Sequence, residues 1–176
     1  MNSAMELLQP LLDYPVISRL RRNHGLEHAT IHMLSARYRG QSMAGRSTPS
    51  GFYLYGDLPT ASVAEAADEA LRRMRGGEHH LAVHPGCGTN FVMAGTFAAV
   101  AAFLALLGSE RSLRARLSRL PTVVLATTIA LIAAQPAGFA VQQHVTTSGV
   151  PGGLEIADVR LLSRRPVVTH RVDTRG

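Results

Sequence analysis

The segment His24-Gly-Leu-Glu27-His28 holds the residues of this chain whose types and spacing most suggest chemistry. On a helix, His24 and His28 lie one turn apart, so both imidazoles project from the same face. Glu27 lies roughly 60° around the axis from that pair, within reach of a metal-bound water. A hydrolytic zinc site needs two neutral imidazoles that hold the ion and a carboxylate that takes a proton from water. The spacing therefore predicts His24 and His28 as metal ligands and Glu27 as the catalytic base, although so short a pattern also arises by chance.

A second cluster, His84-Pro-Gly-Cys87-Gly-Thr89, places an imidazole and the only thiol of the chain three residues apart. Turns rich in Pro and Gly can aim two side chains at one point. A lone cysteine makes no intramolecular disulfide, which leaves the roles of core filler, metal ligand or nucleophile. Together with the helical pair, His84 and Cys87 form a ligand set suited to a divalent ion, most simply zinc. The alternative is that Cys87 is a buried thiol ahead of the next helix.

The number of protein ligands decides which function such a site supports. With His24, His28 and Cys87 as ligands, a fourth position stays open for water, and the preferred function is metal-dependent hydrolysis. If His84 also binds, four protein ligands close the site, which then becomes structural. The alternative function is therefore a non-enzymatic, metal-stabilised membrane scaffold or sensor, acting with a membrane protein partner or as a homo-oligomer.

Other titratable residues are weaker candidates for the site. His32 lies one turn beyond His28 and is a further ligand, a neighbour that orients one, or a polar residue at the helix edge. Glu78 is a carboxylate ligand or part of a solvated turn. His170 is expected in an edge strand, without a role in the site.

The charge balance bears on the partners. The sequence of 176 residues has a formal net charge of +6, and all 18 of its basic residues are arginine. Such a balance suits an anionic membrane surface or nucleic acid. The arginines are scattered through every region, however, and aromatic side chains are not interleaved with them as a base-stacking surface requires. The composition therefore favours the lipid bilayer as a partner and argues against nucleic-acid binding.

Two long uncharged runs lie in the middle of the chain. The first extends from Pro85 to Ser109 and includes the apolar stretch 91–108, and the second extends from Leu120 to Gln143. Each run is long enough to cross a hydrocarbon core of about 30 Å as a helix. Because a short Arg-rich connection joins them, the pattern predicts a transmembrane hairpin whose two ends return to the same side. The alternative is a helical hairpin buried in a soluble protein.

Two opposing features bear on the orientation of this hairpin. The connection carries Arg111, Arg114, Arg116 and Arg119, and the positive-inside tendency favours a cytoplasmic position for such a loop. That orientation would translocate about ninety N-terminal residues that do not begin with a signal-peptide pattern. We therefore expect a multi-pass protein of the inner cell membrane whose soluble part lies in the cytoplasm.

Outside the hairpin the pattern predicts a small α+β domain in two pieces. Helices are expected over 5–12, 16–39 and 57–75, a loop over 40–50, and strands over 51–56 and 81–83. Two further strands, over 154–162 and 167–172, are expected to pair with those before the membrane. The predicted organisation is a first soluble part at 1–88, a transmembrane hairpin at 89–143 and C-terminal strands at 144–176 that complete the soluble domain.

The two blocks HG-x-EH and HP-x-CGT-x-F, in this order, resemble those of a bacterial family of uncharacterised membrane proteins. That family carries HGAEH and HPRCGTSF and is described as predicted metal-dependent enzymes. The chain also resembles, over most of its length, a smaller family from Chloroflexota and cyanobacteria with the same HGLEHAT segment. The shared positions are His24, Gly25, Glu27, His28, His84, Pro85, Cys87, Gly88, Thr89 and Phe91.

The chain differs from the larger family in having fewer membrane spans and Ala-Thr in place of Lys after His28. The H-x-x-E-H spacing is also similar to that of pitrilysin-type peptidases, but the chain has no assignable downstream glutamate ligand. The resemblance thus implies a metal-dependent membrane enzyme, and it extends to zinc-peptidase-like hydrolysis only through the H-x-x-E-H spacing.

Overall fold

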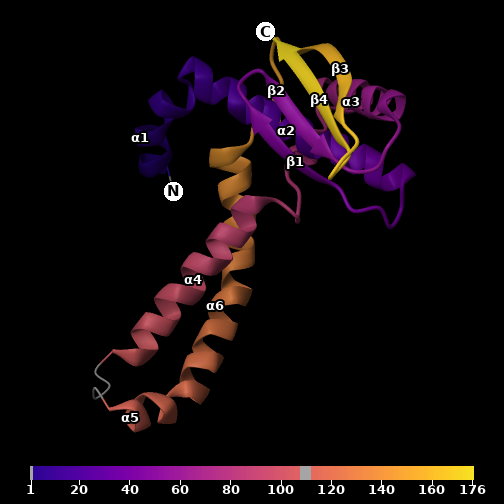
Figure 1. Ribbon diagram of the computed structural model, residues 1–176. Coiled ribbons are helices and arrows are strands. Elements are labelled where there is room, and N and C mark those ends of the chain that lie inside the picture. Colours follow the sequence, from indigo (N-terminus) through magenta and orange to yellow (C-terminus); the bar gives the residue numbers. More distant parts are fainter. Residues whose placement is uncertain (1, 108–111) are drawn as a thin grey trace. The chain divides into compact units, whose positions relative to one another are not determined.

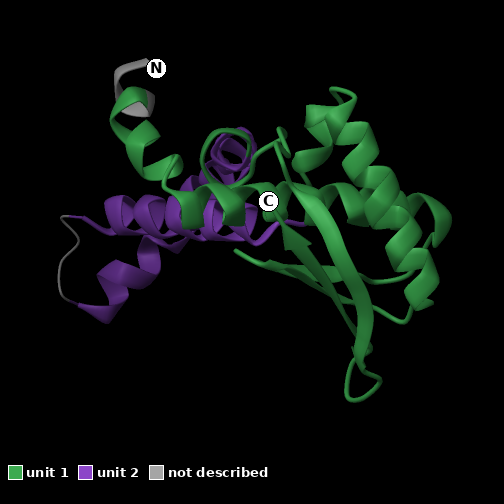
Figure 2. Cartoon of the chain, turned by 90° about the horizontal axis from the view of Figure 1, so that it is seen from above, with its two compact units in different colours: residues 1–84, 143–176 green, residues 85–142 purple. Residues whose placement is uncertain are grey.

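Helix α2 (Pro15–Arg37) is the central element of the larger of two units into which the chain divides. The computed structural model describes residues 2–107 and 112–176. Unit 1 comprises residues 1–84 and 143–176, and unit 2 comprises residues 85–142 (Figure 2). The predictions that concern Gly108, Ser109 and Arg111 lie outside the described residues.

The helices of unit 1 follow the predicted ones closely. Helix α1 (Asn2–Leu12) precedes α2, which starts at Pro15, where the fixed φ of proline suits a first helical turn. Helix α3 (Thr60–Arg75) packs against α2. Its side chains that face the core recur at helical spacing: Val63, Ala66, Ala67, Ala70, Leu71 and Met74. The predicted helices at 16–39 and 57–75 are therefore confirmed, with ends that differ by at most three residues.

An antiparallel sheet of four strands completes unit 1 in the described part of the chain (Figure 1). The strands are β1 (Ala44–Thr48), β2 (Gly51–Tyr55), β3 (Glu155–Ser163) and β4 (Thr169–Arg175), in the order β1-β2-β4-β3. Strand β2 pairs with β4 from Gly51 opposite Asp173 to Tyr55 opposite Thr169. The predicted pairing of C-terminal strands with a strand that precedes the apolar runs is therefore confirmed, as is the α+β class.

Two local predictions are wrong. The stretch 40–50, predicted as a loop, contains β1, whose sequence Ala-Gly-Arg-Ser-Thr lacks apolar alternation because this strand lies at the sheet edge. Of the stretch 81–83, predicted as a strand, the first two residues lie within a 3₁₀ turn (η1, His79–Ala82) and Val83 follows it. Leu81 and Ala82 are both buried. Neighbouring side chains of a strand point to opposite faces, whereas a tight turn can bury both.

His170 lies in the interior of the sheet and not in an edge strand as predicted. Its partners in the sheet are Leu54 of β2 and Leu161 of β3, and its side chain is fully buried. Neither ring nitrogen has a hydrogen-bond partner within the described residues. Burial, with a smaller contribution from the charge of Arg164, lowers the pKa of His170 below its ordinary value of 6.5. The neutral ring therefore fills a core position, and its two buried nitrogens without partners lower the free energy of unfolding.

Replacement of His170 by leucine should raise the free energy of unfolding by about 1–3 kcal/mol, because it removes two buried polar atoms without partners. It should also weaken the pH dependence of stability. The folded wild-type ring stays neutral while the unfolded chain takes up a proton below pH 6.5, so wild-type stability falls as the pH drops through this range. Urea unfolding at pH 7.5 and pH 5 checks both effects. Unchanged stability at both values would show that the ring has polar partners in solution.

Unit 2 is built from two long apolar helices. Helix α4 (Gly88–Leu106) and helix α6 (Leu120–Val141) pack side by side (Figure 1), and the short helix α5 (Leu113–Ser118) precedes α6. Both long helices are long and apolar enough to cross a membrane. No residue of α4 is buried, and large apolar side chains such as Phe103 and Ile132 are about two-thirds exposed at 65% each. Among the described residues, their outer surface is thus apolar and exposed.

A polar contact joins the start of α4 to Gln142, the residue that follows α6. The Gln142 amide donates to the Asn90 side-chain oxygen at 2.7 Å. A β-carbon on Gly138 would overlap that oxygen, so glycine permits the close approach of α6 to α4. Pro136 lies within α6, which continues to Val141.

Candidate metal centre

Helix α2 presents His24 and His28 side by side, with ring centroids 4.5 Å apart. His24 Nδ1 lies 2.9 Å from the Thr146 carbonyl oxygen, and His28 Nδ1 lies 2.7 Å from the Ala82 carbonyl oxygen. A carbonyl can only accept, so each Nδ1 carries the proton and each Nε2 keeps a lone pair. This is the arrangement in which a histidine binds a metal through Nε2 while its other nitrogen is held by the main chain.

Cys87 supplies a third donor. The ligand atoms of His24, His28 and Cys87 all lie within 4.8 Å of one another. His28 and Cys87 are buried and His24 is half-buried. Zinc binds imidazole nitrogen at about 2.0 Å and thiolate sulfur at about 2.3 Å, so donors around one ion lie a few ångströms apart. This His-His-Cys cluster could therefore hold a metal ion.

The glycine of the H-G-L-E-H segment has a structural reason that sequence reasoning missed. A β-carbon on Gly25 would overlap the Ser148 carbonyl oxygen and lie 3.1 Å from the Ala82 β-carbon. These two contacts involve the same stretches of main chain that orient the imidazoles. The Thr146 carbonyl, two residues before Ser148, accepts from His24 Nδ1, and the Ala82 carbonyl accepts from His28 Nδ1. Glycine at position 25 thus allows both stretches to approach α2 closely enough to orient the imidazoles.

Glu27 is buried on the side of α2 that faces β1. Its side chain accepts a hydrogen bond from the Ser47 hydroxyl. A β-carbon on Gly45 would overlap the Glu27 carboxylate, so a glycine makes room for it. Burial raises the pKa of Glu27, and the Ser47 hydrogen bond and the charge of His24 oppose that shift. A carboxylate with a raised pKa is a better proton acceptor, as a general base requires. The sequence predicts a loop at this point, so it does not reveal Gly45 and Ser47 of β1 as partners of Glu27.

His84 lies close to the histidines of α2 but is not one of the three clustered donors. Its ring centroid is 5.7 Å from that of His28 and 4.9 Å from that of His32. Burial and the charges of His32 and His28 lower the pKa of His84 to about 4. At neutral pH the ring is therefore uncharged, which is the state a metal ligand needs.

The remaining predicted candidates have other partners. His32 Nε2 lies 2.9 Å from the Val83 carbonyl oxygen, so this residue contacts the chain just before His84. Glu78 accepts a hydrogen bond from Arg73 Nε at 2.8 Å, and this contact lowers the pKa of the carboxyl group. Glu78 is thus part of an ion pair on the surface and does not join the clustered donors.

Comparison with known proteins places the chain in a family. The model of a family described as a domain of unknown function, DUF6391, matches residues 19–159. The chain belongs to this family. The matched segment contains the candidate donors of α2 together with His84 and Cys87, so the whole cluster lies inside the family domain.

A relative from the cyanobacterium Picosynechococcus sp. (strain PCC 7002) is described as an uncharacterised protein. It is 31% identical over 152 residues, which cover 80% of this chain and 71% of the relative. The resemblance to a cyanobacterial family that the sequence indicated is thus borne out. No solved structure matches the chain.

Proposed function

We propose that this protein is a metal-dependent hydrolase of the cell membrane. The observation that carries the proposal is the cluster of three donors beside a buried glutamate. His24, His28 and Cys87 lie within 4.8 Å of one another, and Glu27, next to His28 on the same helix, has a raised pKa. Three protein ligands are the number that leaves a position for water in a catalytic zinc site.

The donor set fits zinc. Two imidazoles are fixed in the tautomer that presents Nε2, and a thiol is a soft donor that zinc accepts readily. When bound, the ion supplies a Lewis acid that lowers the pKa of a bound water toward 7. Glu27 would then take a proton from that water, with Ser47 holding the carboxylate in place. The ring of His24 would stay oriented by Thr146 throughout.

A second function is favoured by the position of His84. Its ring is neutral at pH 7 and lies next to His28. As a fourth ligand it would close the coordination shell, and the ion would then stabilise a membrane scaffold or sensor without catalysis.

Substitution with cobalt separates the two functions. The purified full-length protein loaded with Co²⁺ should show a sulfur-to-cobalt charge-transfer band that disappears in Cys87→Ser. If a position is open, azide should change the ligand-field spectrum of the wild type. A spectrum insensitive to azide, which becomes sensitive in His84→Ala, would assign the closed, structural site. Identical spectra for wild type and Cys87→Ser would remove Cys87 from the ligand set.

The membrane assignment is also part of the proposal. The apolar outer surfaces of α4 and α6 suit a hydrocarbon environment, and both helices have spanning length. Helix α1 exposes Leu7 and Leu11, as expected of a helix that lies in the membrane interface. We place the hairpin across the inner membrane, with unit 1 in the cytoplasm.

This orientation predicts that the connection between the two helices faces outward. Cysteine introduced as Ser112→Cys should react with a membrane-impermeant maleimide added to intact spheroplasts. The wild type, whose only thiol is the buried Cys87, is the matched control. Labelling that requires lysis would place the connection in the cytoplasm and reverse the orientation.

A further inference from the structure

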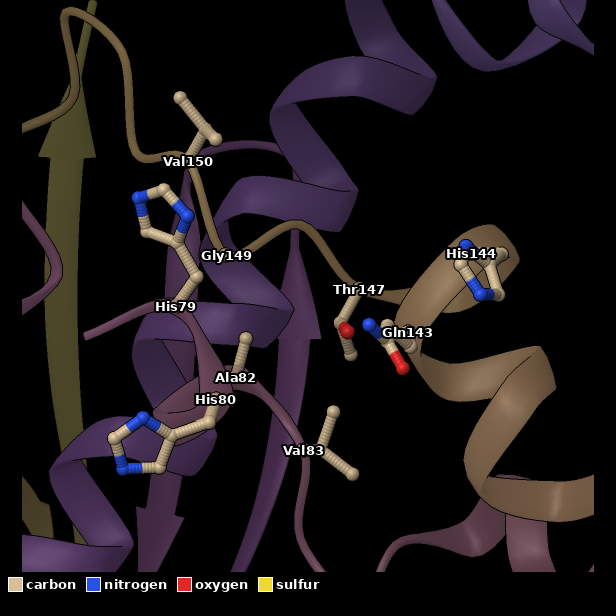
Figure 3. A pocket seen from close by; sticks show the side chains of 9 residues that line it. All are labelled: His79, His80, Ala82, Val83, Gln143, His144, Thr147, Gly149 and Val150. Atoms are coloured by element: carbon tan, nitrogen blue, oxygen red, sulfur yellow. The ribbon is translucent and has the colours of Figure 1, made fainter. Parts of the chain in front are cut away.

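Two hollows in the described part of the chain differ in what can fill them. The hollow shown in Figure 3 belongs to unit 1 and is lined by three exposed histidines, whose ring nitrogens water can satisfy. A second hollow, of about 370 Å³, belongs to unit 2 and lies between α4 and α6. Its lining is mainly apolar and includes the exposed side chains of Phe91, Leu131 and Phe139. This hairpin groove therefore opens on the apolar outer surface of the two helices.

The polar side chain of Gln135 interrupts the apolar lining of the hairpin groove. Gln135 is exposed, and its amide has no hydrogen-bond partner within the described residues. Asn90, the other polar residue of the lining, donates to the Pro85 carbonyl at 2.9 Å and accepts from the Gln142 amide at 2.7 Å. A side-chain amide offers two N–H donors and one carbonyl acceptor. Gln135 thus brings two donors and an acceptor without partners to the groove.

Pro136 adds a further acceptor at the same level of α6. In an α-helix the carbonyl of Ile132 would accept from the N–H of residue 136, but proline has no N–H. Ile132 and Gln135 are three residues apart, so they are neighbours on one helix face, and both are exposed. One turn of α6 therefore presents two N–H donors and two carbonyl acceptors on its outer surface.

The depth of this turn decides which partners it can have. With the hairpin across the membrane, as in the proposed function, the hydrocarbon layer begins after Arg119, the last charged residue before α6. Gln135 lies about 22 Å of helix beyond Leu120. The hydrocarbon layer is about 30 Å thick, so the turn lies inside it. Acyl chains have neither donors nor acceptors, and polar groups at this depth are satisfied by neighbouring helices.

We propose that two copies of this chain pair in the membrane through their hairpin grooves, with the two Gln135 amides as mutual partners. A two-fold axis brings the same surface of both copies together. Each amide then donates one N–H to the partner's Gln135 oxygen and the other to the partner's Ile132 carbonyl. The two donors of each copy match the two acceptors of the other, so a second copy satisfies the whole turn. The apolar lining of the groove packs against the other hairpin.

Disulfide formation between copies tests this pairing. The purified full-length protein is reconstituted in phosphatidylcholine liposomes with Leu131→Cys in the groove or Ile129→Cys on the opposite side of α6. Both native side chains are exposed, so the oxidant reaches either position. With copper phenanthroline, Leu131→Cys should form a covalent dimer. Ile129→Cys should not exceed the wild type, whose only thiol is the buried Cys87.

Gln135→Leu tests the amide itself. Placed in the Leu131→Cys protein, it should lower the lipid dilution at which half of the dimer is lost by at least about tenfold, because each copy loses its hydrogen bonds to the other. Thr96→Leu is the matched control. It removes a hydroxyl that already donates to the Val92 carbonyl within α4 at 2.9 Å, so the dimer should be retained.

The outcomes separate the pairing from the proposed function. Equal cross-linking of Ile129→Cys and Leu131→Cys, or an unchanged dimer in Gln135→Leu, overturns the pairing. Protein that alkaline carbonate extracts from the liposomes overturns the membrane placement and the pairing with it. Protein that resists extraction but stays monomeric overturns the pairing alone. The metal centre is followed separately by elemental analysis, and Gln135→Leu should retain the zinc content of the wild type.

Discussion

Replacement of His28 by alanine should remove nearly all bound zinc from the purified protein. The change deletes one of three clustered donors and, in addition, leaves the buried Ala82 carbonyl without its partner. Loss of groups that merely orient a ligand weakens metal binding by about 10–100-fold, so loss of a ligand itself should exceed about 100-fold. His24→Ala should have the same effect on zinc with less effect on stability, because His24 is only half-buried. Elemental analysis of zinc measures both variants.

His80→Ala is the matched control for these two variants, since His80 is an exposed histidine outside the clustered donors. It should retain the zinc content of the wild type. Circular dichroism of all three proteins shows whether any loss of metal follows from unfolding. Full zinc content in folded His24→Ala and His28→Ala would contradict the metal centre.

Replacement of Glu27 by glutamine should leave fold and zinc content intact while reducing turnover by at least about 100-fold. The amide has nearly the same volume and keeps an acceptor for the Ser47 hydroxyl, but it cannot take a proton from water. Zinc content and melting temperature can be measured at once. Turnover is measured on amides and esters.

The pH dependence of the metal-free protein gives a second readout for Glu27. Because its folded pKa is raised, the folded state holds a proton that the unfolded state has lost, and wild-type stability falls as the pH rises from 4.5 through the raised value. Glu27→Gln should lack this contribution. Loss of both zinc and stability in Glu27→Gln would instead make the carboxylate a structural anchor for β1, and retained turnover would exclude it as the base.

The helices could be predicted from the sequence because their signals are local. The apolar spacing of α3 and the uncharged runs of α4 and α6 need no knowledge of the rest of the chain. Strand β1 could not be predicted, because Ala-Gly-Arg-Ser-Thr becomes a strand only by pairing with β2. The interior position of His170 was missed for a related reason, since strand order depends on contacts between residues far apart in sequence.

The candidate metal-binding residues could be predicted from the sequence, but the groups that orient them could not. The spacing of His24 and His28 indicated the ligand pair, and the Pro/Gly turn indicated Cys87, which the structure brings to that pair. The carbonyls that orient the rings are main-chain atoms of Ala82 and Thr146, and any residue type could supply them. No sequence motif marks such partners.

Unit 1 is formed from two stretches of chain, residues 1–84 and 143–176, which are synthesised before and after the apolar helices. His24, His28 and Cys87 leave the ribosome early, but the carbonyl of Thr146 and strand β4 follow only after the apolar helices have been made. A nascent chain that ends before residue 143 therefore has all three donors without the group that orients His24 or the strand that pairs with β2. The metal centre can be completed only after both apolar helices have been synthesised, so metal acquisition would follow their synthesis and not that of α2.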